Sequence, residues 1–397
     1  MRILSPVLAA VVTILAGQPL YAQSLKAEEV FSSIAVRPLS APDPVTGADE
    51  RVHLAYELLV VNPSRLYVTL HKVEAIEAER RLLGSMEGDA LSKMTTPYAG
   101  TGLEIPPGGS ATVFMDVSFA VGAPLPSDLF ARITAKRMAA GADGKAQPMP
   151  KDSPIPETFT FTGAGTGIGK PAVAVAPPLK GAGWVAVNGC CDEITSHRGA
   201  VMSINGRLRV PERFAIDWVK IDDKGRLFEG DVSKLQSYPY YGAPVLAAAD
   251  GIVVNLYDEA DEQVPGGDAK GITTENIGGN MLVVDIGGGA YAFYAHLQRG
   301  SLKVKLGDRV KTGEVIGLLG NTGNSTAPHL HFHVMDGPSP LDANGLPFVF
   351  KRFSSQGKLA PGSDEAIQRG EPASIVKATS GEHINQLPLN NEVVDFD

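Results

Sequence analysis

Apolar and polar residues alternate along much of the first part of the chain. Residues 53–61 and 111–117 are clear cases, and turn-forming residues at 62–64 and 106–109 separate them from neighbouring segments of the same kind. A period of two places successive side chains on opposite faces of a strand. Short strands at this spacing, broken by proline and glycine turns, are typical of a β-sandwich, which we predict for residues 25–165.

A change of composition follows this first block. Residues 166–183 are rich in Gly, Ala, Pro and Lys and have no periodicity, which indicates a semi-rigid linker. A second strand-rich block extends over residues 184–350. From residue 351 to residue 397 the chain is polar and patternless, and we expect a loosely docked or disordered C-terminal tail there.

The first residues have the pattern of an export signal. Arg2 is followed by an apolar run from Ile3 to Ala16, and a small residue, Ala22, stands at a suitable cleavage position. The run is too short for a comfortable membrane span, and an uncleaved anchor is the alternative. We therefore predict a signal peptide over residues 1–22, no membrane span after its removal, and a periplasmic or secreted protein.

Composition and charge limit the classes of function and of fold that this chain can have. The 397 residues carry a formal net charge of −9, which argues against a nucleic-acid-binding protein because such proteins normally present a basic surface. The 44 glycines and 29 prolines favour short strands and turns over long helices. Cys190 and Cys191 are adjacent, so they form either a vicinal disulfide or two buried thiols. His53 and His71, in the first block, stand alone and are expected to be ordinary surface residues.

Histidines concentrate in one short segment of the second block. In residues 327–334 (APHLHFHV), alternation places His329, His331 and His333 on one face of a strand. Imidazole is the commonest neutral nitrogen ligand of zinc and the acid–base group best matched to neutral pH, so this face predicts a metal or catalytic site. The other face should pack in the core through its apolar residues, Leu330, Phe332 and Val334.

The sequence around this segment resembles a known family. Residues 239–334 are similar to the core of the lysostaphin-type (LytM-like) zinc metallopeptidases, which cut peptide crosslinks in bacterial cell walls. The resemblance implies a small antiparallel β fold with a groove across one sheet. Order and spacing agree over GAPVLAAADG (242–251), GNMLVV (279–284), YAHL (294–297), GDRVKTGEVIG (307–317), GNTG (320–323) and PHLHF (328–332).

The resemblance also implies a set of site residues. In this family, zinc is held by the His and Asp of an H-x-x-x-D motif and by the second His of an H-x-H motif. By resemblance, the Asp and the second-His roles fall on Asp217 and His331, and the catalytic roles fall on His296 and His329. The implied cofactor is Zn²⁺ with an activated water, and the implied partners are peptidoglycan or its stem and crosslink peptides.

One position departs from the family pattern. Arg213 stands four residues before Asp217, where a His ligand would be expected, and a guanidinium has no lone pair to offer a metal. His197 is the nearest substitute for the missing ligand, His333 is the other, and a site without metal is the third alternative. Without zinc, Arg213 would pair with Asp217. With zinc, it would point away and leave His197 to complete the ligands.

We therefore expect an all-β protein with an N-terminal, immunoglobulin-like β-sandwich and a C-terminal lysostaphin-type antiparallel β-sheet peptidase domain. The expected function is zinc-dependent hydrolysis of peptidoglycan crosslinks outside the cytoplasm. The alternatives are a metal-free degenerate domain that binds cell wall or activates a partner cell-wall hydrolase, and a metallopeptidase that acts on proteins. Residues 258–279 are polar and Gly-rich, and they either border the groove and set specificity or form a plain solvated loop.

Overall fold

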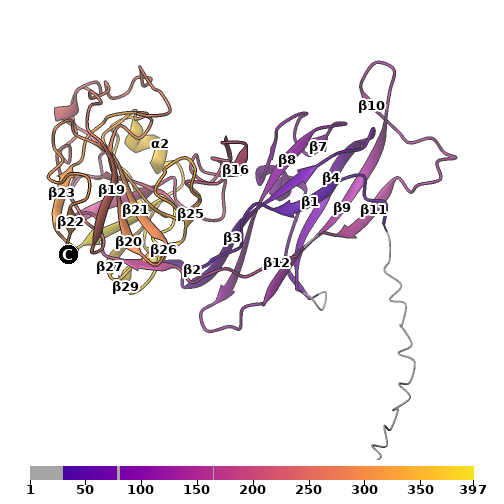
Figure 1. Ribbon diagram of the computed structural model, residues 1–397, viewed down its shortest axis with the longest axis horizontal. Helices are drawn as coiled ribbons and strands as arrows, with labels where there is room; N and C mark the ends of the chain where they lie inside the picture. The colour runs from indigo at the N-terminus through magenta and orange to yellow at the C-terminus, as the bar shows by residue number, and fades with distance from the viewer. Residues whose placement is uncertain (1–29, 78–80, 164) are drawn as a thin grey trace, which may run out of the picture. The chain divides into compact units, whose positions relative to one another are not determined.

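Strands make up nearly all of the regular structure in the computed structural model (Figure 1). The structure describes residues 30–77, 81–163 and 165–397. The signal peptide predicted for residues 1–22 lies outside these described residues.

Helices are few and short in the described part of the chain. They are α1 (Gly88–Lys93), α2 (Ser363–Gln368) and the 3₁₀ turns η1 (Leu235–Ser237) and η2 (Lys377–Thr379). None of these helices is long and apolar enough to span a membrane. The prediction of an all-β protein is confirmed.

Two antiparallel sheets enclose one core in the first part of the chain, and we call them the N-terminal sheets. β9 shows the alternation of the sequence clearly, because every second residue along most of it is buried. Apolar residues of both sheets meet in one buried cluster, as Leu54 of β3 and Ile133 of β9 illustrate. The five strands of one sheet are β1 (Ala35–Pro38), β2 (Pro44–Thr46), β3 (Arg51–Val61), β6 (Thr95–Pro97) and β8 (Ser110–Ala120). The seven strands of the other are β4 (Tyr67–Ile76), β5 (Leu82–Glu87), β7 (Glu104–Ile105), β9 (Asp128–Ala140), β10 (Ala146–Gln147), β11 (Thr158–Thr162) and β12 (Thr166–Gly167).

The segment expected to be a linker, residues 166–183, is held at several points. β12, which lies at the start of this segment, pairs with β9. β13 (Val173–Val175) pairs in parallel with β26 (Phe348–Phe350), and β14 (Gly181–Val187) begins inside the segment. The connection between the two strand-rich blocks is therefore partly built into neighbouring strands.

Backbone contacts also join the N-terminal sheets to the second part of the chain, and residues 32–397 form one unit. The amide N–H of Ala48 donates to the carbonyl oxygen of Leu387 at 3.0 Å. The N–H of Leu387 donates to the carbonyl oxygen of Thr46 at 2.8 Å. Val45 belongs to the buried cluster that fills the second part. The two parts therefore share apolar packing as well as hydrogen bonds.

The second part is built on one large antiparallel sheet of twelve strands. The strand order is β22-β19-β20-β21-β24-β17-β14-β30-β27-β28, with β25 beside β24 and β29 beside β27. Two short antiparallel pairs, β15 with β16 and β18 with β23, lie outside this sheet. The bounds of these strands are β15 (Met202–Ile204), β16 (Arg207–Arg209), β17 (Ile216–Lys220), β18 (Pro244–Leu246), β19 (Gly251–Tyr257), β20 (Asn280–Gly287), β21 (Ala290–Leu297), β22 (Arg309–Val310), β23 (Val315–Leu318), β24 (Leu330–Met335), β25 (Gly345–Leu346), β27 (Phe353–Leu359), β28 (Ile375–Val376), β29 (Gly381–His383) and β30 (Glu392–Phe396).

β24 has the predicted alternation. Leu330, Phe332 and Val334 are fully buried in the core of the second part. His331 and His333 face the other side together, and 2.9 Å separates Nε2 of His331 from Nδ1 of His333. The prediction of one apolar and one histidine face is therefore confirmed.

The segment from residue 351 onward is not the loosely docked tail that its polar composition led us to expect. It forms β27 to β30 and α2, coloured yellow in Figure 1, and β30 lies between β14 and β27. Val393 and Val394 are fully buried, and the buried carboxylate of Glu392 accepts a hydrogen bond from Thr379. The strands of this segment contain few apolar residues. The sequence therefore shows no periodic pattern long enough to predict them.

His53 is not the surface residue that we expected, since only 4% of it is exposed. Its ring lies between two carboxylates, with Nδ1 2.9 Å from Oδ2 of Asp116 and Nε2 3.2 Å from the carboxylate of Asp49. The sequence could not show this because Asp116 lies on a neighbouring strand, far along the chain. His71 is exposed, as expected.

Candidate metal centre

Two paired strands bring the first two site residues together. β17 and β24 are antiparallel neighbours, and Asp217 lies opposite His331 in their register. Directly opposed residues point to the same face of a sheet, so the carboxylate and the imidazole meet there. The Nδ1 atom of His331 lies 3.0 Å from Oδ1 of Asp217, and only 5% and 13% of these two side chains are exposed.

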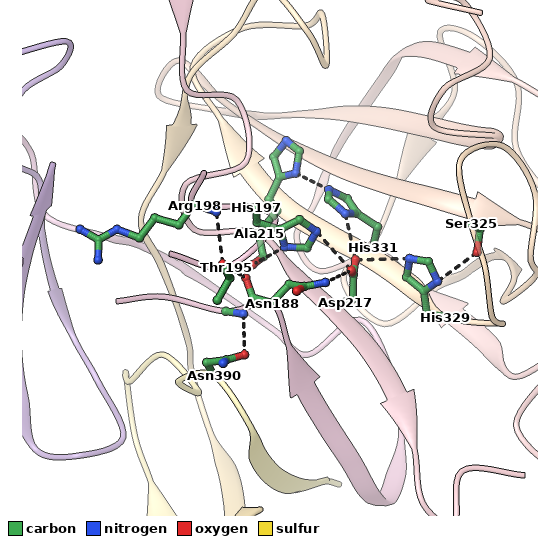
Figure 2. A network of polar contacts seen from close by, with 12 residues as sticks. Asn188, Thr195, His197, Arg198, Ala215, Asp217, Ser325, His329, His331 and Asn390 are labelled. Atoms are coloured by element: carbon green, nitrogen blue, oxygen red, sulfur yellow. Dashed lines mark hydrogen bonds and ion pairs between the residues drawn. The ribbon is translucent and has the colours of Figure 1, made fainter. Parts of the chain in front are cut away.

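A loop between β14 and β15 adds a third residue. The Nε2 atom of His197 lies 3.2 Å from Oδ2 of Asp217. Its Nδ1 lies 3.0 Å from the carbonyl oxygen of Ala215, which can only accept, so in the neutral ring Nδ1 carries the proton and Nε2 keeps the lone pair that a metal would take. His197, Asp217 and His331 each offer one ligand atom, and these three atoms lie within 4.8 Å of one another (Figure 2).

Asn188, at the start of the same loop, also contacts the carboxylate. Its side-chain Nδ2 donates to Oδ2 of Asp217 at 2.9 Å. The backbone carbonyl oxygen of Asn188 accepts a hydrogen bond from Thr195 Oγ1 at 2.8 Å. Cys190 and Cys191 follow after Gly189 and are joined by a disulfide, so the first of their two expected states is the one found. No motif in the sequence pointed to Asn188, because a lone Asn carries no pattern.

The other residues considered as ligands or partners lie outside this group. Arg213 contacts Glu57 of β3, with 3.0 Å between its Nε and Oε1, so the pairing of Arg213 with Asp217 expected for a metal-free chain is not the one in the structure. His333 contacts His331 and not the carboxylate. The geometry therefore favours His197 as the third ligand.

His333 lies behind His331 and faces its second ring nitrogen. When Nδ1 of His331 offers its lone pair to a cation, the proton on Nε2 finds an acceptor in Nδ1 of His333, 2.9 Å away. Burial holds the pKa of His333 well below its usual range, and the neighbouring His331 and His197 lower it further. The ring of His333 therefore stays neutral and able to accept this hydrogen bond.

Two further imidazoles border the group, with 4.5 Å between the ring centroids of His296 and His329. Nδ1 of His329 lies 2.8 Å from the carbonyl oxygen of Ala327, and Nδ1 of His296 lies 2.7 Å from that of Thr322. Each neutral ring therefore donates from Nδ1 and keeps its lone pair on Nε2. Nε2 of His329 is 3.3 Å from Oδ1 of Asp217.

His296 reaches the site because β21 is irregular at its end. Ala295 pairs with His331 and faces the site, so plain alternation would turn His296 to the opposite face. The backbone of His296 has φ +63°, a left-handed conformation that costs about 1–3 kcal/mol for a residue with a side chain. Its N–H donates to the carbonyl oxygen of Gly278 at 2.8 Å, and its own carbonyl accepts from Gly320 at 3.0 Å, which holds the turn.

The carboxylate of Asp217 dominates the electrostatics of the site. Burial acts to raise its pKa, but His197 and His329 hold this pKa well below its usual range. Burial likewise acts to lower the pKa of His197, but the carboxylate raises it to about 9. The carboxylate of Asp217 thus stays ionised in a buried place and favours a positive charge beside it. One carboxylate and two imidazoles form a ligand set that zinc accepts, so these residues fit the predicted cofactor.

Two cavities adjoin the group. A cavity of about 430 Å³ is lined by His197 and His296, and by Ile277 and Gly278 from the polar segment 258–279. That segment therefore borders the site. A second cavity of about 480 Å³ is lined by Phe228, Gly266 and Ile367, the last on α2. Both cavities are also lined by Asn188, Asp217, Thr326 and His329.

Comparison with known proteins identifies the family. Residues 236–343 match the profile of peptidase family M23. This part of the chain is an M23 peptidase domain. The family predicted from the sequence is therefore confirmed, and the matched residues include His296, His329 and His331. They begin after His197 and Asp217, so the match does not bear on those two positions.

The chain is similar to named endopeptidases. It is 34% identical over 122 residues to glycyl-glycine endopeptidase ALE-1 of Staphylococcus capitis, a stretch that covers 31% of this chain and 29% of that protein. It is 32% identical over 102 residues to peptidoglycan DD-endopeptidase ShyA of Vibrio cholerae, covering 26% and 20%. The chain thus spans less than a third of the length of these relatives.

Among solved structures, the catalytic domain of the antimicrobial peptidase lysostaphin from Staphylococcus simulans is 29% identical to this chain. The alignment covers 36% of this chain and 80% of that one, at a TM-score of 0.21.

Proposed function

We propose that this protein is a zinc-dependent endopeptidase that hydrolyses peptide crosslinks of bacterial peptidoglycan. The observation that carries the proposal is the approach of His197, Asp217 and His331, whose ligand atoms lie within 4.8 Å of one another next to two further imidazoles. The names of the M23 relatives ALE-1 and ShyA support the substrate class. The predicted signal peptide supports action outside the cytoplasm.

His197, Asp217 and His331 would hold the zinc. When bound, zinc lowers the pKa of a water ligand and polarises the peptide carbonyl. The carbonyl of Ala215 fixes the orientation of the His197 ring, and Asn188 holds the second oxygen of Asp217. These contacts keep the ligand atoms converged before any ion arrives.

His329 and His296 are the acid–base pair of this proposal. The ring of His329 is oriented by Ala327, so its Nε2 accepts the proton of the attacking water and later donates it to the leaving amine. The ring of His296 lies beside it, 4.5 Å between centroids, and its Nε2, once it has taken up a proton, donates to the oxygen that gains negative charge. Asp217 lines two cavities, which give an extended peptide room at the site.

The metal-free alternative rested on Arg213, which stands where the family has a His. Because Arg213 contacts Glu57 and His197 lies beside Asp217, that observation no longer favours a degenerate site. The activator of a separate hydrolase is therefore not proposed.

The experiment that tests the proposal compares wild-type protein with His331→Ala, using His71→Ala as the control. We expect about one zinc per chain and release of crosslink peptides from purified peptidoglycan for the wild type, and neither for His331→Ala. His71 is exposed on β4, so its loss should change neither result. A wild-type protein that holds no zinc, or a fully active His331→Ala variant, would contradict the proposed function.

A further inference from the structure

Two buried arginines stand next to the residues proposed to hold the metal. Arg198 directly follows His197, and Arg213 lies four residues before Asp217. Only 1% of each arginine is exposed. A guanidinium is protonated at every ordinary pH, so burying one is costly unless partners compensate its charge.

The partners of both arginines come from the N-terminal sheets. Nε of Arg213 lies 3.0 Å from Oε1 of Glu57, an ion pair that is not aligned as a hydrogen bond, and Glu57 is fully buried. Nη2 of Arg213 also donates to Ser40 Oγ. Nη2 of Arg198 donates to the carbonyl oxygen of Met115 on β8 at 2.5 Å. Each arginine therefore bridges a site segment to β3 or β8.

The two site segments are also tied to each other. His197 donates to the carbonyl oxygen of Ala215, which lies between Arg213 and Asp217 in the chain. The N–H of Arg198 donates to Thr195 Oγ1 at 3.2 Å, inside the loop shown in Figure 2. A shift of either arginine would therefore move the backbone that carries His197 or Asp217.

We propose that the N-terminal sheets are a positioning element of the metal centre: Glu57 and the Met115 carbonyl anchor Arg213 and Arg198, and thereby the segments that carry Asp217 and His197. This inference rests on the proposed function. It assigns a role to Arg213, which serves as an anchor at a position where the family has a ligand. Glu57 is a positioning residue, because it touches neither the ligands nor a substrate.

Zinc affinity of the full chain tests the inference. It is measured by competition with a chromophoric chelator, together with the visible spectrum of the Co²⁺-substituted protein. We expect Glu57→Gln to weaken zinc binding by about 10–100-fold, as loss of outer-shell partners does, and to alter the Co²⁺ spectrum. The spectrum reports ligand geometry, which a purely structural role of Glu57 would leave unchanged.

Glu74→Gln is the matched control. Glu74 is also a buried carboxylate that pairs with an arginine, at 2.7 and 2.9 Å from Arg132, but both residues lie within one N-terminal sheet. This variant should keep wild-type zinc affinity and spectrum. If Glu57→Gln does not fold, Glu57→Leu/Arg213→Met removes both buried charges together and should still show the weakened affinity.

The outcomes separate the two proposals. Wild-type affinity and spectrum in folded Glu57→Gln, or in the double variant, would overturn the positioning role and leave the proposed function standing. Equal weakening in Glu57→Gln and Glu74→Gln would also overturn it, because the loss would then follow general destabilisation. A wild-type chain that binds no zinc would overturn the proposed function and this inference with it.

Discussion

Asp217 and His331 are directly opposed on β17 and β24, and 3.0 Å separates Oδ1 of the carboxylate from Nδ1 of the imidazole. This pairing fixes two of the three proposed ligands by strand register alone. A slip of one residue in either strand would turn one of them to the apolar face. The third ligand, His197, comes from a loop, so its position depends on the contacts of that loop.

His197→Ala should remove stoichiometric zinc. The variant loses a first ligand, so its zinc affinity should fall by more than the roughly 10–100-fold that loss of an outer partner costs. Metal analysis after dialysis against a weak chelator is the measurement, with His71→Ala as the control for loss of an imidazole. Full zinc content in His197→Ala would exclude it as a ligand.

His329→Ala should separate catalysis from metal binding. The ring is oriented by Ala327 and is not among the three ligands, so removing it should lower the hydrolysis rate by about 10²–10⁴-fold. Zinc content should stay near one per chain. Digestion of purified peptidoglycan and metal analysis of the same sample check both statements. A variant with the wild-type rate would show that His329 has no acid–base role.

Substitutions at His333 test its hydrogen bond with His331, one of the three proposed ligands. His333→Ala removes the acceptor 2.9 Å from Nε2 of His331, and we expect zinc affinity about 10–100-fold weaker. His333→Gln offers an amide oxygen as a replacement acceptor and should recover part of the loss. If both variants bind zinc as the wild type does, the orientation of His331 is set by other contacts.

The histidine segment shows what the sequence could and could not predict. Alternation was enough to place His331 and His333 on one face, because the period of a strand is a local property. The approach of His197 to Asp217 depends on a non-periodic loop, so the sequence left it as one of three alternatives. His296 was assigned by resemblance alone, since the left-handed turn that aims it cannot be read from strand periodicity.

The sequence could not predict the partner of Arg213 either, because that partner lies far away along the chain. Glu57 lies in the N-terminal sheets, and nothing in its strand pattern marks a buried carboxylate as the counter-charge of a residue in the second part. Ion pairs between distant segments leave no local pattern. From the sequence we considered Asp217 as the partner of Arg213 in a metal-free chain, and the structure does not show this pair.

Phe396→Ala tests the docked C-terminal segment. The ring of Phe396 is 3% exposed and packs on Trp218 and Phe350, with centroids 5.1 and 5.4 Å apart. Its removal should lower the free energy of unfolding by about 3–5 kcal/mol, as for other large aromatic residues in cores. Urea unfolding is the measurement. Ile384→Ala, at a residue 61% exposed in the same segment, should change it by less than about 0.5 kcal/mol. Equal effects would mean that the segment is not part of the core.

His53 should make stability depend on pH in the alkaline range. Burial acts to lower the pKa of His53, but hydrogen bonds with Asp116 and Asp49 outweigh it and raise the pKa to about 9, from 6.5 in an unfolded chain. A raised pKa means that the folded protein binds the proton more tightly than the unfolded chain does.

The contribution of His53 is therefore fully present below about pH 6.5 and is lost as the pH rises towards about 9. The total loss should be at most about 3 kcal/mol in the free energy of unfolding. Urea unfolding of metal-free protein at pH 6, 7.5 and 9 measures it, because zinc binding would otherwise add its own pH dependence. His53→Gln, which cannot titrate, should be less stable than the wild type at pH 6 and should show a flatter profile. If His53→Gln loses stability between pH 6 and 9 as steeply as the wild type, then the proton held between Asp49 and Asp116 does not contribute to folding.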